Sequence, residues 1–177
     1  MPLKSGIVVL VLTLAPLSVT ACGTQDNPLV HEGIVAAPLD DVWKALTTKE
    51  GQESWMVAHS EIDLKIGGRM RTHYDRKGVI GDAKTIENTI LSYDPKRMLS
   101  FKVSKPPEGF PFPSAVKNMW TVIYFEANTP KTTRVRIVGL GFGDDEESKK
   151  MRAFFDRGNA FTLKKLQERF ASKKSAE

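Results

Sequence analysis

The end of the chain carries the sequence feature that most constrains the fold, a long amphipathic segment at residues 144–170. Along it, apolar residues and one glycine recur three and four positions apart, the spacing of a single helix face: Met151, Phe154, Phe155, Gly158, Leu163, Leu166 and Phe170. Asp144, with Glu147 three residues later, predicts an N-cap and its reciprocal partner. Burial of each phenylalanine contributes roughly 1.5–3 kcal/mol, so such a helix requires a partner surface.

The residues before this helix predict an antiparallel sheet that supplies the surface. A first strand is expected at residues 29–36, followed by two short helices at residues 39–46 and 47–55. Six further strands are expected at residues 62–66, 69–74, 82–93, 98–103, 119–126 and 133–140. This order predicts an α+β domain in which one strongly curved antiparallel sheet wraps around the C-terminal helix.

The chain is long enough for one domain with a sizeable core. Of its 177 residues 41% are hydrophobic, and we assign residues 29–172 to a single domain that is followed by a basic tail at residues 173–177. The net charge of +5 is spread along the chain, without a dense basic run before the last helix. The basic helix end could neutralise few phosphates, so we expect no nucleic-acid partner.

The N-terminus resembles a secretion signal. Residues 1–5 carry one lysine, residues 6–19 form an apolar run, and small residues precede Cys22. The apolar run is too short to span a bilayer comfortably, so we interpret residues 1–21 as a signal peptide and residues 22–28 as a tether. The domain is therefore expected to work outside the cytoplasm.

Cys22 decides how the exported protein would be held. The sequence Val-Thr-Ala-Cys that ends at this residue resembles the lipobox of bacterial lipoproteins, in which the cysteine is acylated and becomes the new N-terminus. Cys22 is the only cysteine, so it has no partner for an intramolecular disulfide. The alternative, ordinary cleavage after Ala21, would give a soluble periplasmic or secreted protein with a reactive free thiol. We favour lipidation and attachment to the bacterial cell envelope.

Several motifs in the domain resemble the SRPBCC superfamily, which is also called START-like or helix-grip. Its opening is matched by Val-Ala-Ala-Pro at residues 35–38, by Val-Trp-Lys-Ala-Leu-Thr at residues 42–47 and by Trp55. Two later motifs resemble the branch related to the Hsp90 ATPase activator homologue. These are Asp-Leu-Lys-Ile-Gly-Gly-Arg-Met at residues 63–70 and Ile-Leu-Ser-Tyr-Asp-Pro-Lys-Arg-Met at residues 90–98.

The resemblance covers residues 29–170 and implies a helix-grip fold. In similar proteins the space between the sheet and the long helix is a cavity that is open at one end. The superfamily includes lipid carriers, hormone receptors, aromatic polyketide cyclases and co-chaperone domains, so the fold alone does not decide the function. An exported domain would not meet a cytosolic chaperone, so we do not expect Hsp90 as a partner.

Large apolar side chains are the candidates to line the implied cavity. We expect the lining to include Trp55, Met70, Tyr74, Phe101, Trp120, Phe142, Phe154, Phe155 and Phe161. For each of them the alternative is an ordinary place in the core. Gly158 costs its helix about 1 kcal/mol relative to alanine, so we expect it to serve a close approach or a bend. Aromatic residues and methionine together suit a flat or greasy ligand.

The segment at residues 105–118 interrupts the strand pattern. Prolines flank Phe110 and Phe112 and exclude the segment from a central strand. Two interpretations are open. The segment is either a lid whose phenylalanines contact a bound ligand, or a covering loop that pins the same two side chains into the core.

Metal and catalytic chemistry has little support in the sequence. His31, His59 and His73 are scattered without the spacing of a metal site or a His–carboxylate pair, so we expect no metal and no cofactor. If Tyr74 faces the cavity, it could orient or protonate a bound carbonyl. His73 would then face solvent, because adjacent residues of a strand point to opposite faces.

These features predict a non-catalytic carrier or sensor of a small hydrophobic molecule, either lipid-like or aromatic, tethered to the cell envelope. One alternative is an enzyme of the polyketide cyclase/dehydratase type that uses polar groups in the same cavity. The other is a protein-interaction module with a filled core. A cavity lined only by apolar groups would favour the carrier. Converging ionisable groups in the cavity would favour the enzyme, and the absence of a cavity would favour the interaction module.

Overall fold

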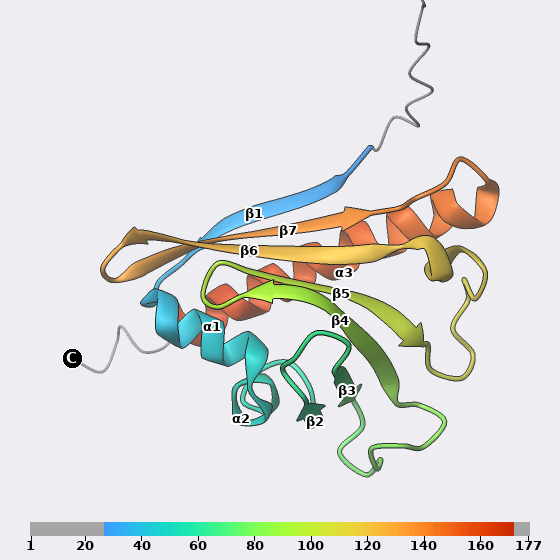
Figure 1. Ribbon diagram of the computed structural model, residues 1–177, viewed down its shortest axis with the longest axis horizontal. Coiled ribbons are helices and arrows are strands. Elements are labelled where there is room, and N and C mark those ends of the chain that lie inside the picture. Colours follow the sequence, from blue (N-terminus) through green and yellow to red (C-terminus); the bar gives the residue numbers. More distant parts are fainter. Residues whose placement is uncertain (1–26, 172–177) are drawn as a thin grey trace, which may run out of the picture.

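The strands pair into one antiparallel sheet in the order β1-β7-β6-β5-β4-β3-β2 (Figure 1). The computed structural model describes residues 27–171, so the predictions for the signal peptide, Cys22 and the basic tail lie outside the described residues. The strands are β1 (Leu29–Val35), β2 (His59–Ile62), β3 (Arg69–His73), β4 (Ile86–Asp94), β5 (Met98–Lys105), β6 (Trp120–Thr129) and β7 (Thr132–Leu140).

Two short helices and one long helix complete the domain. α1 (Leu39–Thr47) and α2 (Lys49–Glu53) follow β1, and the 3₁₀ helix η1 (Ala115–Asn118) precedes β6. The long helix α3 (Glu146–Ala171) runs along the sheet and packs mainly against β1, with further contacts to β7 and η1 (Figure 1). The predicted α+β helix-grip architecture is therefore confirmed.

Two clusters of buried side chains hold α3 against the sheet, one near each end of the helix. The larger cluster joins Leu163, Leu166 and Phe170 of α3 to α1 and to the inner faces of β1 and β4–β7. The smaller cluster joins Met151, in the first turns of α3, to η1 and Met119. The turns of α3 between Met151 and Leu163 contribute no buried apolar side chain to either cluster.

The close approach of helix and sheet occurs at Gly33 on β1 rather than at Gly158. A Cβ on Gly33 would lie 2.8 Å from Gln167 Nε2 and 3.2 Å from a Leu163 methyl carbon, so a side chain there would have to displace these two side chains of α3. A Cβ on Gly158 would meet nothing within 4 Å. The expectation that Gly158 serves a close approach was therefore wrong.

The start of α3 differs by one residue from the prediction. Asp145, not Asp144, caps the helix: its carboxylate accepts hydrogen bonds from the Ser148 amide at 2.9 Å and from the Ser148 hydroxyl at 2.6 Å. Ser148 is therefore the partner three residues after the cap. Glu147, the expected partner, is used elsewhere, because its carboxylate accepts from the backbone amides of Ser114 and Ala115.

Two strand boundaries were also predicted wrongly. The alternation at residues 62–66 belongs to a turn, in which the Gly68 amide donates to the Lys65 carbonyl, and Ile66 is 70% exposed. The ladder instead ends at Ile62. Residues 82–85 are likewise a turn before β4, because the Asp82 carboxylate accepts from backbone amides on both sides of it.

A candidate ligand-binding cavity

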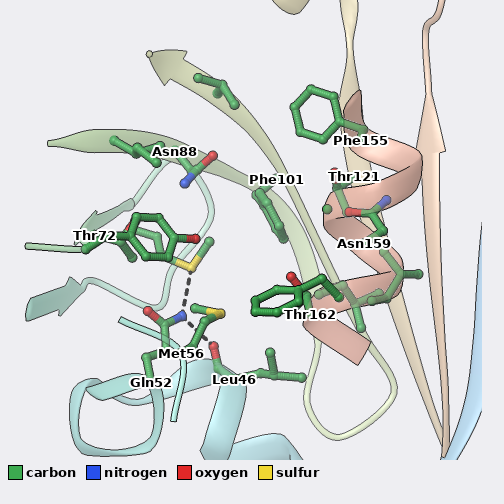
Figure 2. A pocket seen from close by; sticks show the side chains of 18 of the residues that line it. Leu46, Gln52, Met56, Thr72, Asn88, Phe101, Thr121, Phe155, Asn159 and Thr162 are labelled. Atoms are coloured by element: carbon green, nitrogen blue, oxygen red, sulfur yellow. Dashed lines mark hydrogen bonds between the residues drawn. The ribbon is translucent and has the colours of Figure 1, made fainter. Parts of the chain in front are cut away.

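A cavity of about 670 Å³ lies between the sheet and α3, and its lining is mostly apolar. Its floor is formed by inward-facing residues of β3–β7, such as Met70, Leu99 and Ile123. Its roof is formed by the middle turns of α3, between the two core clusters. Figure 2 shows Phe155, Asn159 and Thr162 on α3, across the cavity from Thr72 and Asn88 on β3 and β4.

Eight of the eleven predicted residues line this cavity: Trp55, Met70, Tyr74, Phe101, Phe110, Phe154, Phe155 and Phe161. They come from five separate parts of the chain, which the fold brings together around one space. Three of them have much accessible surface, namely Tyr74 at 64%, Phe161 at 62% and Phe154 at 42%. Part of that surface faces the cavity, because water can enter a space of this size.

The other three predicted residues do not line the cavity. Trp120 takes the opposite face of β6, because the inward position goes to its neighbour Thr121. Phe112 packs edge-to-face against Phe110 and Phe154, with ring centroids 5.7 Å from each. Phe142 packs against Phe155 beyond the cavity, in the smaller core cluster. These side chains stabilise the closed end of the domain.

Gly158 contributes an open surface to the cavity roof. It lies in the lining, and space extends beyond it where a side chain would stand. The Cβ of a larger residue at this position would meet no neighbouring atom within 4 Å. The glycine therefore enlarges the space between helix and sheet.

The lining also holds polar side chains that we did not predict. Thr72, Asn88 and Thr121 project from the sheet, and Asn159 and Thr162 from α3. Each sheet residue stands two positions from an apolar residue of the same inner face, for example Asn88 before Ile90. Their positions, two residues from apolar residues of the same strand, place them on the inner face and could have identified them. The predicted lining was based on large apolar residues and therefore left them out.

The cavity meets the surface near α2 and the end of β3. Trp55, Met56 and Tyr74 line both the cavity and a second, more open hollow of about 580 Å³. The Trp55 indole is fixed by a 3.0 Å hydrogen bond from Nε1 to the Ala45 carbonyl. Desolvation by the surrounding protein raises the pKa of the Tyr74 phenol above its ordinary value of 10.0. The hydroxyl is protonated at neutral pH with or without this shift, and it can donate a hydrogen bond.

Lys165 is the charged residue of the lining and lies on the last turns of α3. Its ammonium is 3.0 Å from the Glu168 carboxylate and 5.6 Å from the centre of the Phe161 ring. The lining, which falls wholly within residues 27–171, holds no histidine, aspartate or glutamate. No group of three or more histidine, cysteine or acidic residues that could hold a metal occurs among the described residues.

His73 is buried, which contradicts the expectation that it faces solvent. Only 2% of it is exposed, and Nε2 lies 3.0 Å from the Asp82 carboxylate. Gly78 covers the ring so closely that a Cβ there would lie 1.9 Å from His73 Cε1. His73 does point away from the cavity that Tyr74 lines, but the loop at residues 75–85 folds back over that side of β3 and buries it.

The chain matches one family model over most of its length. The match covers residues 36–171, and the family is described as Activator of Hsp90 ATPase homolog 1-like protein. The chain belongs to this AHSA1-like family. The match begins just before α1 and runs to the end of α3, so it contains every element that lines the cavity.

Solved structures share the AHSA1-like fold at low sequence identity. A protein from Mesorhizobium loti aligns with a TM-score of 0.63 at 18% identity, over 82% of this chain and 97% of its own. The Aha1 dimer from Colwellia psychrerythraea aligns with a TM-score of 0.62 at 14% identity, over 81% and 95%. An AHSA1-like protein from Aeromonas hydrophila aligns with a TM-score of 0.60 at 17% identity, over 82% and 93%.

Curated proteins give no match to this AHSA1-like chain. The comparisons therefore establish the family and the fold. Within the described part of the chain, the helices are too short or too polar to cross a bilayer.

Proposed function

We propose that the domain binds a small hydrophobic molecule in the cavity, and that it carries or senses this molecule at the bacterial cell envelope. The observation that carries the proposal is the cavity, about 670 Å³ of mostly apolar space. Small-molecule sites typically enclose about 300–1,000 Å³ and are mostly apolar with few polar groups. A ligand that fits this space would gain dispersion contacts with the apolar lining.

The composition of the lining supports binding rather than catalysis. General acid–base chemistry needs a titratable group within hydrogen-bond reach of the reacting atoms. Tyr74 and Lys165 are the ionisable residues of the lining, and both lie towards its accessible side. The cyclase-type alternative therefore finds no pair of converging acid and base groups. A filled interaction module does not fit a domain that contains this cavity.

The location of the binding activity follows from the N-terminus. A lipid on Cys22 would tether the domain to the envelope membrane through the short polar segment at residues 22–28. This placement would separate the domain from cytosolic Hsp90, so we propose a small molecule rather than that chaperone as its partner. The N-terminal residues lie outside the part of the chain that the structure describes.

Blocking the cavity from the helix tests the binding proposal. Gly158→Phe would place a ring in the open space at the cavity roof and keep α3 intact, because glycine is the poorer helix former. We expect the variant to bind the neutral fluorescent probe N-phenyl-1-naphthylamine at least about tenfold more weakly than the wild type, a loss of roughly 1.4 kcal/mol. Fluorescence titration measures the affinity, and circular dichroism checks the fold.

Ala160→Phe is the matched control. Ala160 is exposed on the same helix and does not line the cavity, so the same ring there should leave affinity within about twofold of the wild type. Undiminished probe binding by Gly158→Phe would contradict the proposal. Equal losses in both variants would also contradict it, since they would place the probe outside the cavity.

Replacing the acylated residue tests the proposed tether. Cys22→Ser removes the thiol that would carry the lipid. We expect the wild-type protein, expressed in a bacterium with its full N-terminus, to sediment with membranes and the variant to move to the soluble fraction. One acyl chain alone gives only marginal membrane binding, so the fractionation should be compared with metabolic labelling by palmitate. Labelling that persists in Cys22→Ser would refute the assignment.

A further inference from the structure

One buried amide in the cavity lacks a protein partner. Asn88 on β4 is only 7% exposed and lines the cavity, and its side chain makes no hydrogen bond with any residue between 27 and 171. Figure 2 shows this side chain projecting from its strand towards the space below α3. The Asn88 amide atoms are not among the fully buried atoms that lack a partner, so they keep some access to the cavity. The Asn88 amide is therefore open to a hydrogen-bonding partner that enters the cavity, either water or a ligand.

The neighbouring Gln52 shows how this chain treats a buried amide that has a structural role. Gln52 is 1% exposed, and its Nε2 donates to the Leu46 carbonyl at 2.8 Å and lies 3.3 Å from Met70 Sδ. Its Oε1 accepts from the Ser60 hydroxyl at 2.8 Å. Both ends of this amide are satisfied within the protein. Asn88 has the same functional group in the same cavity wall with neither end satisfied.

The pairing of β4 with β5 is irregular on both sides of Asn88. The pairing of β4 with β5 shifts register between Glu87 and Asn88, and again between Ile90 and Ser92. Bulges of this kind bend a strand and re-aim its side chains, and they are frequent beside functional sites. The first shift leaves Ser104 of β5 as the extra residue, and the second leaves Leu91 of β4, so the ladder is irregular on both sides of Asn88.

The charges around the cavity restrict what Asn88 can receive. The cation of the lining, Lys165, already lies 3.0 Å from a carboxylate and is 45% exposed. An ionised head group beside Asn88 would lose its hydration without gaining a counter-charge, which is unfavourable. A neutral head group loses less, and the amide offers it both a donor and an acceptor. On the opposite wall Asn159 Nδ2 is buried without a partner, and it adds a second neutral polar position.

We infer that the ligand is an uncharged molecule with an apolar body and a hydrogen-bonding group such as a ketone, ester, amide or hydroxyl, and that Asn88 binds this group. A carbonyl oxygen would accept from Asn88 Nδ2, and a hydroxyl would donate to Asn88 Oδ1. The inference rests on the proposed function, because it names the ligand chemistry of the same cavity. It goes beyond that function by predicting that hydrocarbons and carboxylates are poorer ligands than neutral carbonyl compounds.

Three probes of matched shape test this inference by isothermal titration calorimetry. They are 2-acetylnaphthalene, a neutral ketone; 2-ethylnaphthalene, which lacks the oxygen; and 2-naphthoate, which is ionised at pH 7.5. We expect the wild type to bind the ketone about three- to tenfold more tightly than the hydrocarbon, the worth of one hydrogen bond. We expect the naphthoate to bind at least about tenfold more weakly than the ketone.

Asn88→Leu removes the amide and keeps a side chain of similar size. In this variant we expect the preference for the ketone to fall below about twofold, while binding of the hydrocarbon is kept or improved. Thr89→Val is the matched control on the opposite face of β4 and should keep the full preference for the ketone. If Asn88→Leu does not fold, Asn88→Val carries the same prediction, because valine suits a strand.

The outcomes separate this inference from the proposed function. Equal binding of ketone and hydrocarbon by the wild type would overturn the inference and leave apolar binding in place. A ketone preference that survives in the Asn88 variants would overturn the role of Asn88. Naphthoate binding as tight as that of the ketone would overturn the neutral ligand class. Binding of none of the three probes would contradict the proposed function itself.

Discussion

His73 and Asp82 show how single side chains fix the edge of the sheet beside the cavity. The His73 ring is enclosed under Gly78 and bonded to the Asp82 carboxylate, and Asp82 also accepts from the backbone amides of Val79 and Lys84. The hydrogen bond from the Val79 amide is the largest cause that lowers the pKa of Asp82. One carboxylate therefore holds the loop at residues 75–85 against the end of β3.

Asp82→Asn should lower stability in a pH-dependent manner. Because the folded state depresses the pKa of Asp82 below its ordinary value of 3.8, the carboxylate stabilises the fold above that pH. This contribution is lost as the pH falls through the folded-state pKa. We expect urea unfolding to show wild type more stable than variant at pH 7, with the gap narrowing at pH 3. A gap of the same size at both pH values would refute this account.

Residue patterns predicted the apolar part of the cavity better than its polar part. Phe101 and Met70 were found because large apolar residues at alternating strand positions indicate an inner face. Asn88 and Thr121 occupy the same face but are polar, so the hydrophobic pattern did not indicate them. Trp120 was assigned to the wrong face because both faces of β6 carry apolar residues, so hydrophobicity does not distinguish the inner face from the outer face. The polar anchors of a site depend on tertiary placement that local pattern does not encode.

At the scale of elements, α3 is packed against the rest of the domain near both of its ends. The larger cluster holds its last turns, the smaller cluster holds Met151 in its first turns, and the middle turns roof the cavity. The loop between β5 and β6 closes the end nearest Met151. Pro106, Pro107 and Phe110 of this loop line the cavity, while Phe112 packs into the smaller cluster. The loop thus forms part of the cavity wall and also covers the smaller cluster. That its phenylalanines act as a lid over a bound ligand stays a prediction.

Glu147 is the polar link between this loop and α3, and its removal should loosen the loop. Its Oε1 accepts from the Ser114 amide at 3.0 Å and from the Ala115 amide at 3.2 Å. In Glu147→Ala we expect faster hydrogen exchange at residues 114–115, because both amides lose their acceptor. Stopped-flow mixing with N-phenyl-1-naphthylamine should show faster binding and release. Glu147→Gln keeps an acceptor oxygen and should behave as the wild type does. Unchanged exchange in the alanine variant would exclude the link.

The boundaries of elements were harder to predict than their existence. Six of the seven strands and the order of the helices were anticipated, because each has its own apolar period, whereas the strand predicted at residues 62–66 shares only Ile62 with β2. The alternation at residues 62–66 imitated a strand within a tight turn. The register shift that leaves Leu91 of β4 as an extra residue also changes which residues face inward, so counting by twos across Ile90–Ser92 fails. Such shifts arise from pairing with β5 and are invisible in one strand.

At the scale of the whole molecule, ligand binding and folding should be linked. A molecule that occupies the cavity binds only the folded state, so it stabilises the domain by about 2.7 kcal/mol at a free concentration of 100 times Kd. We expect N-phenyl-1-naphthylamine to raise the melting temperature of the wild type in proportion to the logarithm of its concentration. Gly158→Phe should show no such rise. A rise of equal size in that variant would mean that the probe binds elsewhere.

The support of α3 at its two ends has a consequence for substitutions in its middle turns. Gly158, Asn159 and Thr162 belong to neither cluster, so these residues in the middle of α3 can be exchanged without loss of the buried contacts that hold the helix in place. Solved structures share this architecture at 14–18% identity, so the fold persists through wide changes of sequence. Substitutions at the middle of α3 should therefore change the shape of the cavity at little cost to the packing that holds the domain together.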